Sequence, residues 1–283
     1  MSALGDMLTP AYRLVGDGPE TLLYLHGLGG DRTSFDGQIA ARPRAFRHLA
    51  WDMPGYGDSA PLAEMTFPAL ARAALRLLDD VGAARAHVVG HSLGGMIAQE
   101  LVHACPERIA SLVLYATSAA FGGAGGDFQR RFLDARLAPI ERGLAPADIG
   151  RDLVAGLVGE DPDPAGLAAA VGAMARVSPD SYRAALLCLV GFDRRADIAT
   201  IRAPTLLIAG ARDTVAPADM MARMARRIPG PDPGTGARLV AIDAAGHLAH
   251  LERPAEFNAV LREFLESLAA PRRGEHHGLR AHR

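Results

Sequence analysis

The sequence predicts an α/β protein with a mostly parallel, doubly wound sheet. Short apolar runs alternate with longer amphipathic segments along most of the chain. Runs that are apolar throughout are typical of parallel strands whose two faces are both covered by helices. The resulting β-α-β-α order favours strands joined by helical crossovers, and a single long segment without strands interrupts it.

Six apolar runs are predicted as strands, and three segments with helical periodicity are predicted as helices. The strands are Thr21–Leu25, Phe46–Asp52, Ala86–Gly90, Ser111–Ala116, Pro204–Gly210 and Arg238–Asp243. The helices are Phe67–Gly82, Ser92–Pro106 and Pro254–Ala270. Gly82 and Pro106 suit the ends of the first two helices, and Pro254 suits the first turn of the third.

The segment 118–200 contains no convincing strand. It opens with a glycine-rich run and continues as short helical patterns separated by Gly and Pro. We therefore expect an α/β core formed by residues 1–117 and 201–270, with residues 118–200 inserted as a helical cap. Residues 271–283 are polar and aperiodic, which predicts a disordered tail.

Composition excludes several classes of protein. The 283 residues are 49% hydrophobic and 22% charged, and the net charge of −2 gives no reason to expect nucleic acid or a membrane surface as a partner. All 30 basic residues are arginine. Without lysine the chain cannot carry Schiff-base chemistry, a P-loop, a protein kinase site or a Ser-Lys dyad.

The sequence also bears on cellular location and cysteine chemistry. Its first residues lack the basic and apolar segments of a signal peptide, and no apolar run approaches the length of a membrane span. We therefore expect a cytoplasmic protein. Cys105 and Cys188 lie in apolar helical contexts and form no CxxC motif, which favours inert buried thiols over a metal site or a redox dithiol.

The strongest functional signal is Gly90-His91-Ser92-Leu93-Gly94. It follows a predicted strand and opens a predicted helix, which is the context that a nucleophile elbow requires. Such a turn holds the serine hydroxyl clear of the backbone, and only glycine-sized residues fit two positions before and after it. The helix N-terminus would place N–H groups beside developing negative charge. Ser92 is therefore the candidate nucleophile, and a simple glycine-rich turn is the alternative.

A serine nucleophile needs a base, and His247 is the favoured candidate. It lies between the last predicted strand and the last predicted helix, in the kind of loop where open α/β sheets place their sites. His250, three residues later, is the second choice. His91 adjoins Ser92, and side chains of adjacent residues rarely face each other.

The histidine in turn needs an orienting carboxylate. In a nucleophile-elbow fold the chain order is Ser, then acid, then His. Asp213 follows the strand Pro204–Gly210 and lies between Ser92 and His247 in sequence. Asp219, a candidate helix cap, and Asp243, at a strand end, are the alternatives, and Asp213 itself would otherwise be an ordinary loop aspartate.

Further motifs accompany these residues. His26-Gly27-Leu28-Gly29-Gly30 follows one strand, and Asp52-Met53-Pro54-Gly55-Tyr56-Gly57-Asp58-Ser59 follows the next. Together with the elbow, Asp213 and Gly246-His247, they make the chain resemble the α/β-hydrolase superfamily over about Tyr12 to Leu268.

The resemblance implies roles for these residues. Ser92 would be the nucleophile, His247 the base and Asp213 the acid, and the backbone N–H groups of Leu28 and Leu93 would form the oxyanion hole. The serine departs from the haloalkane dehalogenases and epoxide hydrolases of this superfamily, which have an aspartate at that position.

Two subgroups are similar to parts of the chain. The segments Arg142–Ala145 and Ser181–Cys188, followed by Asp193 and Asp197-Ile198, resemble the cap of 3-oxoadipate enol-lactonases. His26-Gly27 and Asp52–Gly55 depart from the forms typical of those lactonases. The meta-cleavage carbon–carbon hydrolases are also similar, but their elbow has Asn where this chain has His91.

These motifs predict a serine hydrolase that cleaves a small ester or lactone through an acyl-enzyme, with no metal or organic cofactor. A carbon–carbon bond hydrolase, or a ligand receptor that retains a slow triad, are the alternatives. Aromatic and aliphatic cap residues are expected to line an acyl pocket, unless they only pack the cap: Phe121, Phe128, Phe132, Met174, Tyr182 and Leu186. Arg130 and Arg131 are candidates for pairing with a substrate carboxylate, with surface solvation as the alternative.

Overall fold

The computed structural model describes residues 8–41, 45–122, 126–232 and 234–269. Within these residues the chain forms a seven-stranded sheet in the order β1-β3-β2-β4-β5-β6-β7. The strands are β1 Tyr12–Val15, β2 Glu20–Leu25, β3 Phe46–Trp51, β4 Ala86–His91, β5 Ile109–Tyr115, β6 Thr205–Gly210 and β7 Arg238–Ile242. The predicted strands are confirmed, although Asp52 and Asp243 fall just beyond the ends of theirs.

Strand β1 is the one strand of this sheet that the sequence did not predict. It pairs with β3 in antiparallel fashion, whereas the other neighbouring strands are parallel. Its side chains are exposed or only half-buried. An edge strand of this kind carries no continuous apolar run, and so it lacks the signal by which the buried strands were found.

The helices alternate with the strands as predicted. The α-helices are α1 Asp36–Ala40, α2 Phe67–Asp80, α3 Leu93–Ala104, α4 Asp127–Glu141, α5 Pro146–Ala155, α6 Pro164–Ala175, α7 Pro179–Val190, α8 Ala218–Ala225, α9 Ala249–Glu252 and α10 Pro254–Ala269. Two 3-10 helices are η1 Pro106–Arg108 and η2 Asp197–Thr200. None of the helices in the described ranges has the length and apolar character needed to cross a bilayer.

Both faces of the sheet are covered, which explains the continuous apolar runs. Leu23 and Leu25 of β2 pack in one apolar cluster with residues of α2, α3 and α8. Leu22 and Tyr24, which point to the opposite face, pack with residues of α1, α9 and α10. The doubly wound α/β arrangement is therefore confirmed.

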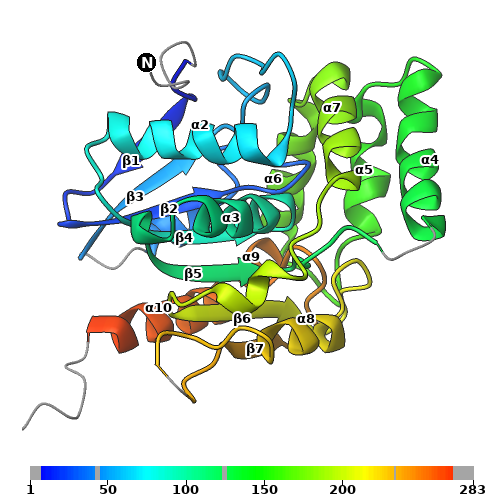
Figure 1. The fold of residues 1–283 in the computed structure, drawn as a ribbon. Helices are drawn as coiled ribbons and strands as arrows, with labels where there is room; N and C mark the ends of the chain where they lie inside the picture. Colours follow the sequence, from blue (N-terminus) through cyan, green and yellow to red (C-terminus); the bar gives the residue numbers. More distant parts are fainter. Residues whose placement is uncertain (1–7, 42–44, 123–125, 233, 270–283) are drawn as a thin grey trace, which may run out of the picture.

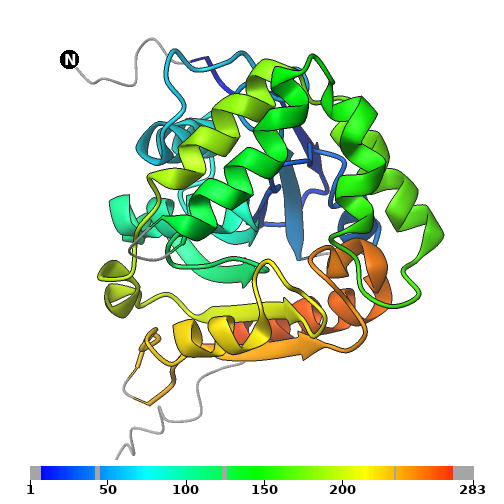
Figure 2. The ribbon, with the colours of Figure 1, turned by 90° about the vertical axis from the view of Figure 1, so that its right-hand side faces the viewer.

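The helices α4 to α7 lie between β5 and β6 in sequence, and they sit together beyond the end of the sheet toward which the parallel strands point (Figures 1 and 2). In the described part of residues 118–200, the strand-like pairing is limited to an isolated bridge between Ala120 and Asp193. We propose that these helices form the predicted cap. Residues 123–125 of its glycine-rich opening, and the predicted tail 271–283, lie outside the described residues.

Candidate active site

Ser92 lies at a sharp turn between β4 and α3. Its backbone angles are φ 51° and ψ −114°, a combination that residues other than glycine rarely adopt. Hydrogen bonds hold this turn: Ser92 N donates to Tyr115 O at 2.9 Å, and Thr117 Oγ1 donates to Ser92 O at 2.8 Å. A Cβ atom on Gly90 would clash with the carbonyl group of Gly94, so the turn has room only for glycine there.

The structure brings Ser92, Asp213 and His247 together at the carboxyl ends of three parallel strands. They follow β4, β6 and β7 respectively. Ser92 Oγ lies 3.0 Å from His247 Nε2, and Asp213 Oδ2 lies 2.8 Å from His247 Nδ1. A carboxylate only accepts, so the Nδ1–H donates to Asp213 and the Nε2 lone pair faces the serine hydroxyl. This is the arrangement that a nucleophile, a base and an orienting acid require.

Asp213 is buried, and both of its carboxylate oxygens have partners. Oδ1 accepts hydrogen bonds from the backbone N–H groups of Val215 at 2.8 Å and Ala216 at 2.9 Å, while Oδ2 faces His247. Burial tends to raise the pKa of Asp213, but the bonds from His247 and from the two amides outweigh it, and the pKa is lowered. The group therefore stays a carboxylate, which suits it to hold an imidazole.

The alternative acid and base candidates either have other partners or are exposed to solvent. Asp219 is exposed and forms an ion pair within α8, and Asp243 is exposed just after β7. His250 is buried, and its Nδ1 lies 3.2 Å from Tyr115 Oη. In the described part of the chain, none of the three is hydrogen-bonded to the serine–histidine pair.

Two buried side chains behind these residues hold the main chain of His247. Tyr115 Oη donates to His247 O at 2.8 Å. His91 Nε2 lies 3.0 Å from the same oxygen, so its N–H donates to it as well. His91 therefore turns away from the neighbouring serine hydroxyl, as expected, but it supports the candidate base from behind. The elbow motif carries no signal for this role, because it does not show which loop its second residue faces.

A buried carboxylate joins the His247 loop to the segment between α5 and α6. Glu252 is 3% exposed, and its oxygens accept hydrogen bonds from Gly246 N at 2.9 Å, Leu248 N at 2.9 Å and Gly159 N at 2.6 Å. Bonds to an ionised acceptor are stronger than neutral ones. Glu252 therefore fixes the residues on both sides of His247.

Replacing Glu252 by Gln should destabilise the protein and slow the enzyme. In Gln, an NH2 group replaces one of the carboxylate oxygens. This donor would face a backbone N–H that donates to the carboxylate in the wild type. Losing one or two charge-assisted bonds should lower the free energy of unfolding by about 2–4 kcal/mol. Urea unfolding and kcat on an activated ester would measure both effects. Glu256→Gln, at an exposed position of α10, is the matched control, and equal stability of the two variants would contradict this role.

Leu28 and Leu93, whose N–H groups are predicted to form the oxyanion hole, line the same cavity as Ser92. Leu93 is the first residue of α3, and Leu28 lies in the loop after β2. Within the described residues, neither backbone N–H donates to another group. Tyr56 Oη donates to Leu28 O at 2.9 Å, which fixes the orientation of the peptide that follows Leu28. Two unpaired N–H groups near a serine nucleophile could stabilise an oxyanion.

His26 attaches the Leu28 loop to the loop after β3. His26 Nε2 accepts a hydrogen bond from Met53 N at 3.0 Å, and His26 Nδ1 donates to Gly27 O at 2.8 Å. Burial lowers the pKa of His26, which keeps the ring neutral and able to accept at Nε2. The histidine of the His26-Gly27 motif thus has a structural role that the motif alone did not reveal.

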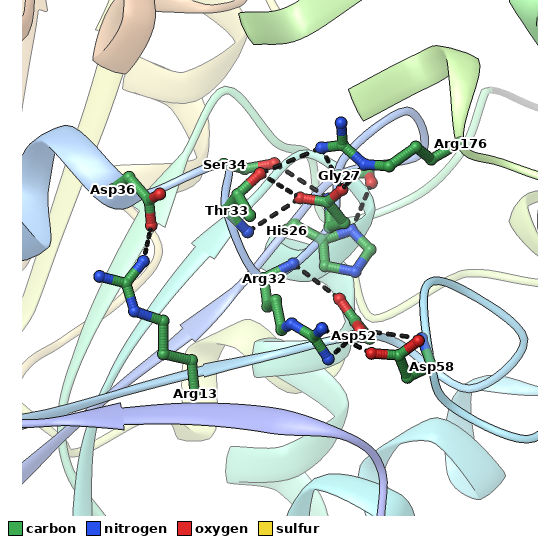
Figure 3. Close-up of polar contacts among 11 residues, drawn as sticks. Arg13, His26, Gly27, Arg32, Thr33, Ser34, Asp36, Asp52, Asp58 and Arg176 are labelled. Carbon is green, nitrogen blue, oxygen red and sulfur yellow. Dashed lines mark hydrogen bonds and ion pairs between the residues drawn. The ribbon is translucent and has the colours of Figure 1, made fainter. Parts of the chain in front are cut away.

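A network of carboxylates and arginines surrounds the same loop (Figure 3). Arg32 N donates to Asp52 Oδ1 at 2.8 Å, and Arg32 Nη1 donates to Asp52 Oδ2 at 3.0 Å. Asp31 Oδ1 accepts from Thr33 N at 2.8 Å, and Asp31 Oδ2 accepts from Arg176 Nε at 2.8 Å. Because Arg176 follows α6, this pair links the Leu28 loop directly to the segment that we propose as a cap.

Ser92 and His247 open into a cavity of about 480 Å³ beneath the helices α4 to α7. This volume is in the range of small-molecule sites. Most of its wall is apolar and includes Met96, Leu153, Val154, Ala173, Met174 and Leu251. A larger concavity of about 1040 Å³ lies at the amino ends of the strands, near His87 and Thr205, and contains none of the predicted catalytic residues. Open α/β sheets bind ligands at the carboxyl ends, which favours the smaller cavity.

The structure places most of the predicted pocket residues on the cavity wall and one of them elsewhere. Phe121, Phe128, Phe132 and Tyr182 line the cavity. Leu186 does not, because it is fully buried in the apolar cluster beneath α7 and packs there instead. The three phenylalanines also pack on one another, with 5.0 Å between the ring centroids of Phe121 and Phe132.

The predicted arginines are also placed elsewhere. Arg130 and Arg131 are exposed and do not line the cavity, and Arg130 is engaged in an ion pair within α4. Arg136 of the same helix is part of the cavity wall. The sequence contains a pattern that predicts this position of Arg136. Phe128, Phe132 and Arg136 are spaced by four residues and so share one face of a helix.

Buried histidines near the site should make the protein sensitive to acid. Burial lowers the pKa of His250 to about 3 and the pKa of His91 well below its ordinary value. Between about 6.5 and 3 the unfolded chain binds protons that the folded chain does not. The contribution of these histidines to the free energy of unfolding is therefore fully present above about pH 6.5. It falls as the pH drops, by up to about 1.4 kcal/mol per pH unit for each histidine.

Urea unfolding at pH 7 and pH 5 would measure this effect. His250→Gln should give a smaller loss between the two pH values than the wild type, even if the variant is less stable at pH 7. His103→Gln, at an exposed position of α3, should leave the wild-type pH dependence in place. A His250→Gln protein with the full wild-type dependence would show that His250 does not contribute.

Among the described residues, no group of three His, Cys, Asp or Glu side chains is arranged to hold a metal ion.

The family model described as "alpha/beta hydrolase fold" matches residues 20–254. The chain belongs to the α/β-hydrolase family. The hydrolase expected from the motifs is thus supported at the level of the family.

Individual relatives are similar over most of the chain. One relative is the dihydrolipoyllysine-residue acetyltransferase component of the acetoin cleaving system of Cupriavidus necator. It is 30% identical over 275 residues, and the match covers 92% of this chain and 67% of that protein. A thermophilic esterase from Thermogutta terrifontis, solved with malate bound, is 26% identical with a TM-score of 0.81, covering 92% and 94% of the two chains. The enol-lactonase of Burkholderia xenovorans is 26% identical with a TM-score of 0.77, covering 90% and 96%.

Proposed function

We propose that this α/β hydrolase cleaves carboxylic esters or lactones through an acyl-enzyme, with Ser92 as nucleophile, His247 as base and Asp213 as acid. The observation that carries the proposal is the hydrogen-bonded series from Asp213 to His247 to Ser92, with distances of 2.8 and 3.0 Å. The series ends in an apolar cavity large enough for a small ester.

The proposed reaction follows from the position of each atom. His247 Nε2 takes the proton from Ser92 Oγ as that oxygen attacks the substrate carbonyl. The Leu28 and Leu93 N–H groups stabilise the oxyanion, and the leaving alcohol receives the proton from His247. Water, activated by the same nitrogen, then attacks the acyl-enzyme and releases the acid. Asp213 keeps the imidazole in the required tautomer throughout.

Lactones belong in the proposed substrate class beside simple esters. The similarity to an enol-lactonase and to an esterase at 26% identity supports both types of carbonyl substrate. A lactone differs only in that the leaving alcohol and the acyl group belong to one molecule, so water cleaves the acyl-enzyme to release a single hydroxy acid. The same three residues and two N–H groups would perform both reactions.

A panel of substrates tests the proposal. Nitrophenyl esters of increasing acyl length, simple lactones and enol-lactones of dicarboxylic acids would be compared by steady-state kcat/KM, with meta-cleavage diketones as the carbon–carbon alternative. We expect sustained turnover of at least one ester or lactone. A single burst of acylation without further turnover would support a receptor, and cleavage of diketones alone would support carbon–carbon hydrolysis.

A further inference from the structure

Among the described residues that line the cavity above Ser92, one side chain is permanently charged. This is Arg136, and the other polar side chains of the lining belong to Ser, Thr, His and Tyr182. Most of the wall is aliphatic or aromatic. A purely apolar substrate would make no favourable contact with a cation at this position. Burying a cation in apolar surroundings costs desolvation free energy unless a negative charge is paired with it.

Arg136 has no acidic partner in the described part of the chain. Its guanidinium carbon lies 3.6 Å from the centroid of the Phe132 ring, and no hydrogen bond or ion pair joins it to another described residue. By contrast, Arg183 of α7 is paired with Glu141 at 3.3 Å. Burial lowers the pKa of Arg136, in agreement with a site that is partly removed from water.

The neighbouring phenol does not supply the missing negative charge. Tyr182 lines the same cavity and interacts electrostatically with Arg136. Burial raises the pKa of Tyr182 to about 12, so the phenol is neutral at physiological pH. Stacking on Phe132 orients the guanidinium but leaves its N–H donors free to bind an anion.

We propose that Arg136 binds a carboxylate of the substrate, and that the preferred substrates are esters or lactones that carry a carboxylate some distance from the scissile carbonyl. A guanidinium matches a carboxylate through two parallel N–H···O bonds. The carbonyl would lie at Ser92 and the carboxylate at Arg136, with the apolar linker against the cavity wall. This inference rests on the proposed hydrolase function, because it names the substrate class of the same site.

Matched pairs of substrates test the inference. Monomethyl esters of linear dicarboxylic acids of increasing length would be compared with methyl esters of monocarboxylic acids of the same length. We expect the wild type to prefer the anionic ester of each pair at one optimal length. In Arg136→Gln the ratio of kcat/KM for anionic over neutral ester should fall by about 10- to 100-fold, the usual range for a charge-assisted contact.

Two further variants separate charge from packing. Arg131→Gln removes an exposed arginine of the same helix that does not line the cavity, and it should keep the wild-type preference. Arg136→Lys retains the positive charge and should keep more of the preference than Arg136→Gln. Competitive inhibition by free glutarate should weaken in Arg136→Gln in parallel with the kinetic ratio, and circular dichroism with thermal unfolding would check that each variant folds.

The outcomes distinguish failure of the proposed hydrolase function from failure of the proposed role of Arg136. If the wild type hydrolyses neither ester of any pair, nor any ester or lactone of the wider panel, the proposed function fails. If it hydrolyses neutral esters well without preferring anionic ones, and Arg136→Gln changes nothing, only the role of Arg136 is overturned. If Arg136→Gln does not fold, the preference of the wild type and of Arg136→Lys, together with glutarate inhibition of both, decides the question.

Discussion

Replacing Ser92 by alanine should abolish hydrolysis while the fold remains intact. The variant lacks the hydroxyl oxygen that we propose forms the acyl bond, and the loss of a triad serine typically lowers kcat on the order of 10⁶-fold. Alanine fits the turn because the clash in the elbow arises at the flanking glycines rather than at Ser92. Turnover of a nitrophenyl ester, circular dichroism and labelling by a fluorophosphonate would be measured together.

A second serine in the same cavity provides the control. Ser118 also lines the cavity, and its Oγ donates to Ala120 O at 2.8 Å. Ser118→Ala should retain activity and the covalent label, whereas Ser92→Ala should lose both. Residual activity of Ser92→Ala within tenfold of the wild type, with the label on another residue, would falsify the assignment.

Replacing Asp213 by asparagine should lower kcat by about 10³- to 10⁴-fold, close to the effect of the equivalent change in serine proteases. The structure gives the reason. Oδ1 of Asp213 accepts two backbone N–H bonds, from Val215 and Ala216, so the carbonyl oxygen of Asn would occupy that position. The amide NH2 would then face His247 Nδ1. The ring would be forced to accept at Nδ1 and to carry its proton on Nε2, where it could no longer accept the serine proton.

Two other aspartates serve as matched controls. Asp219, in the first turn of α8, and Asp243, just after β7, are both exposed and are the acids that the sequence left as alternatives. Asp219→Asn and Asp243→Asn should keep kcat within about tenfold of the wild type. An Asp213→Asn enzyme that is nearly as fast as the wild type, beside an inactive Asp219→Asn or Asp243→Asn, would place the acid on another loop.

The catalytic candidates were predictable because local rules determine their surroundings. Gly90 and Gly94 flank Ser92 because a Cβ at Gly90 would meet the carbonyl group of Gly94. Strands buried on both faces produce the apolar runs that mark the carboxyl ends of the sheet. Since Ser92, Asp213 and His247 each follow such a run, parallel pairing alone places them at the same edge.

The supporting residues were not predictable in this way. Tyr115 lies in a buried strand, where its side chain looks like any other core aromatic residue, and only the docking of the loop after β7 brings His247 O to its hydroxyl. Glu252 follows the candidate base by five positions, but its three N–H donors include one from Gly159, far away in sequence. Contacts of this kind depend on the docking of segments that no local pattern connects.

The sequence by itself determined which segments form parallel strands, the elbow at Ser92 and the preferred candidates for acid and base, because these follow from short-range sterics and from strand direction. Only the tertiary structure decided which cap side chains face the cavity. Leu186 and Arg136 both lie on helices of the segment 118–200, yet Leu186 packs into the core while Arg136 lines the cavity. A helix has apolar residues on more than one face, and its rotation is set by the surfaces against which it packs.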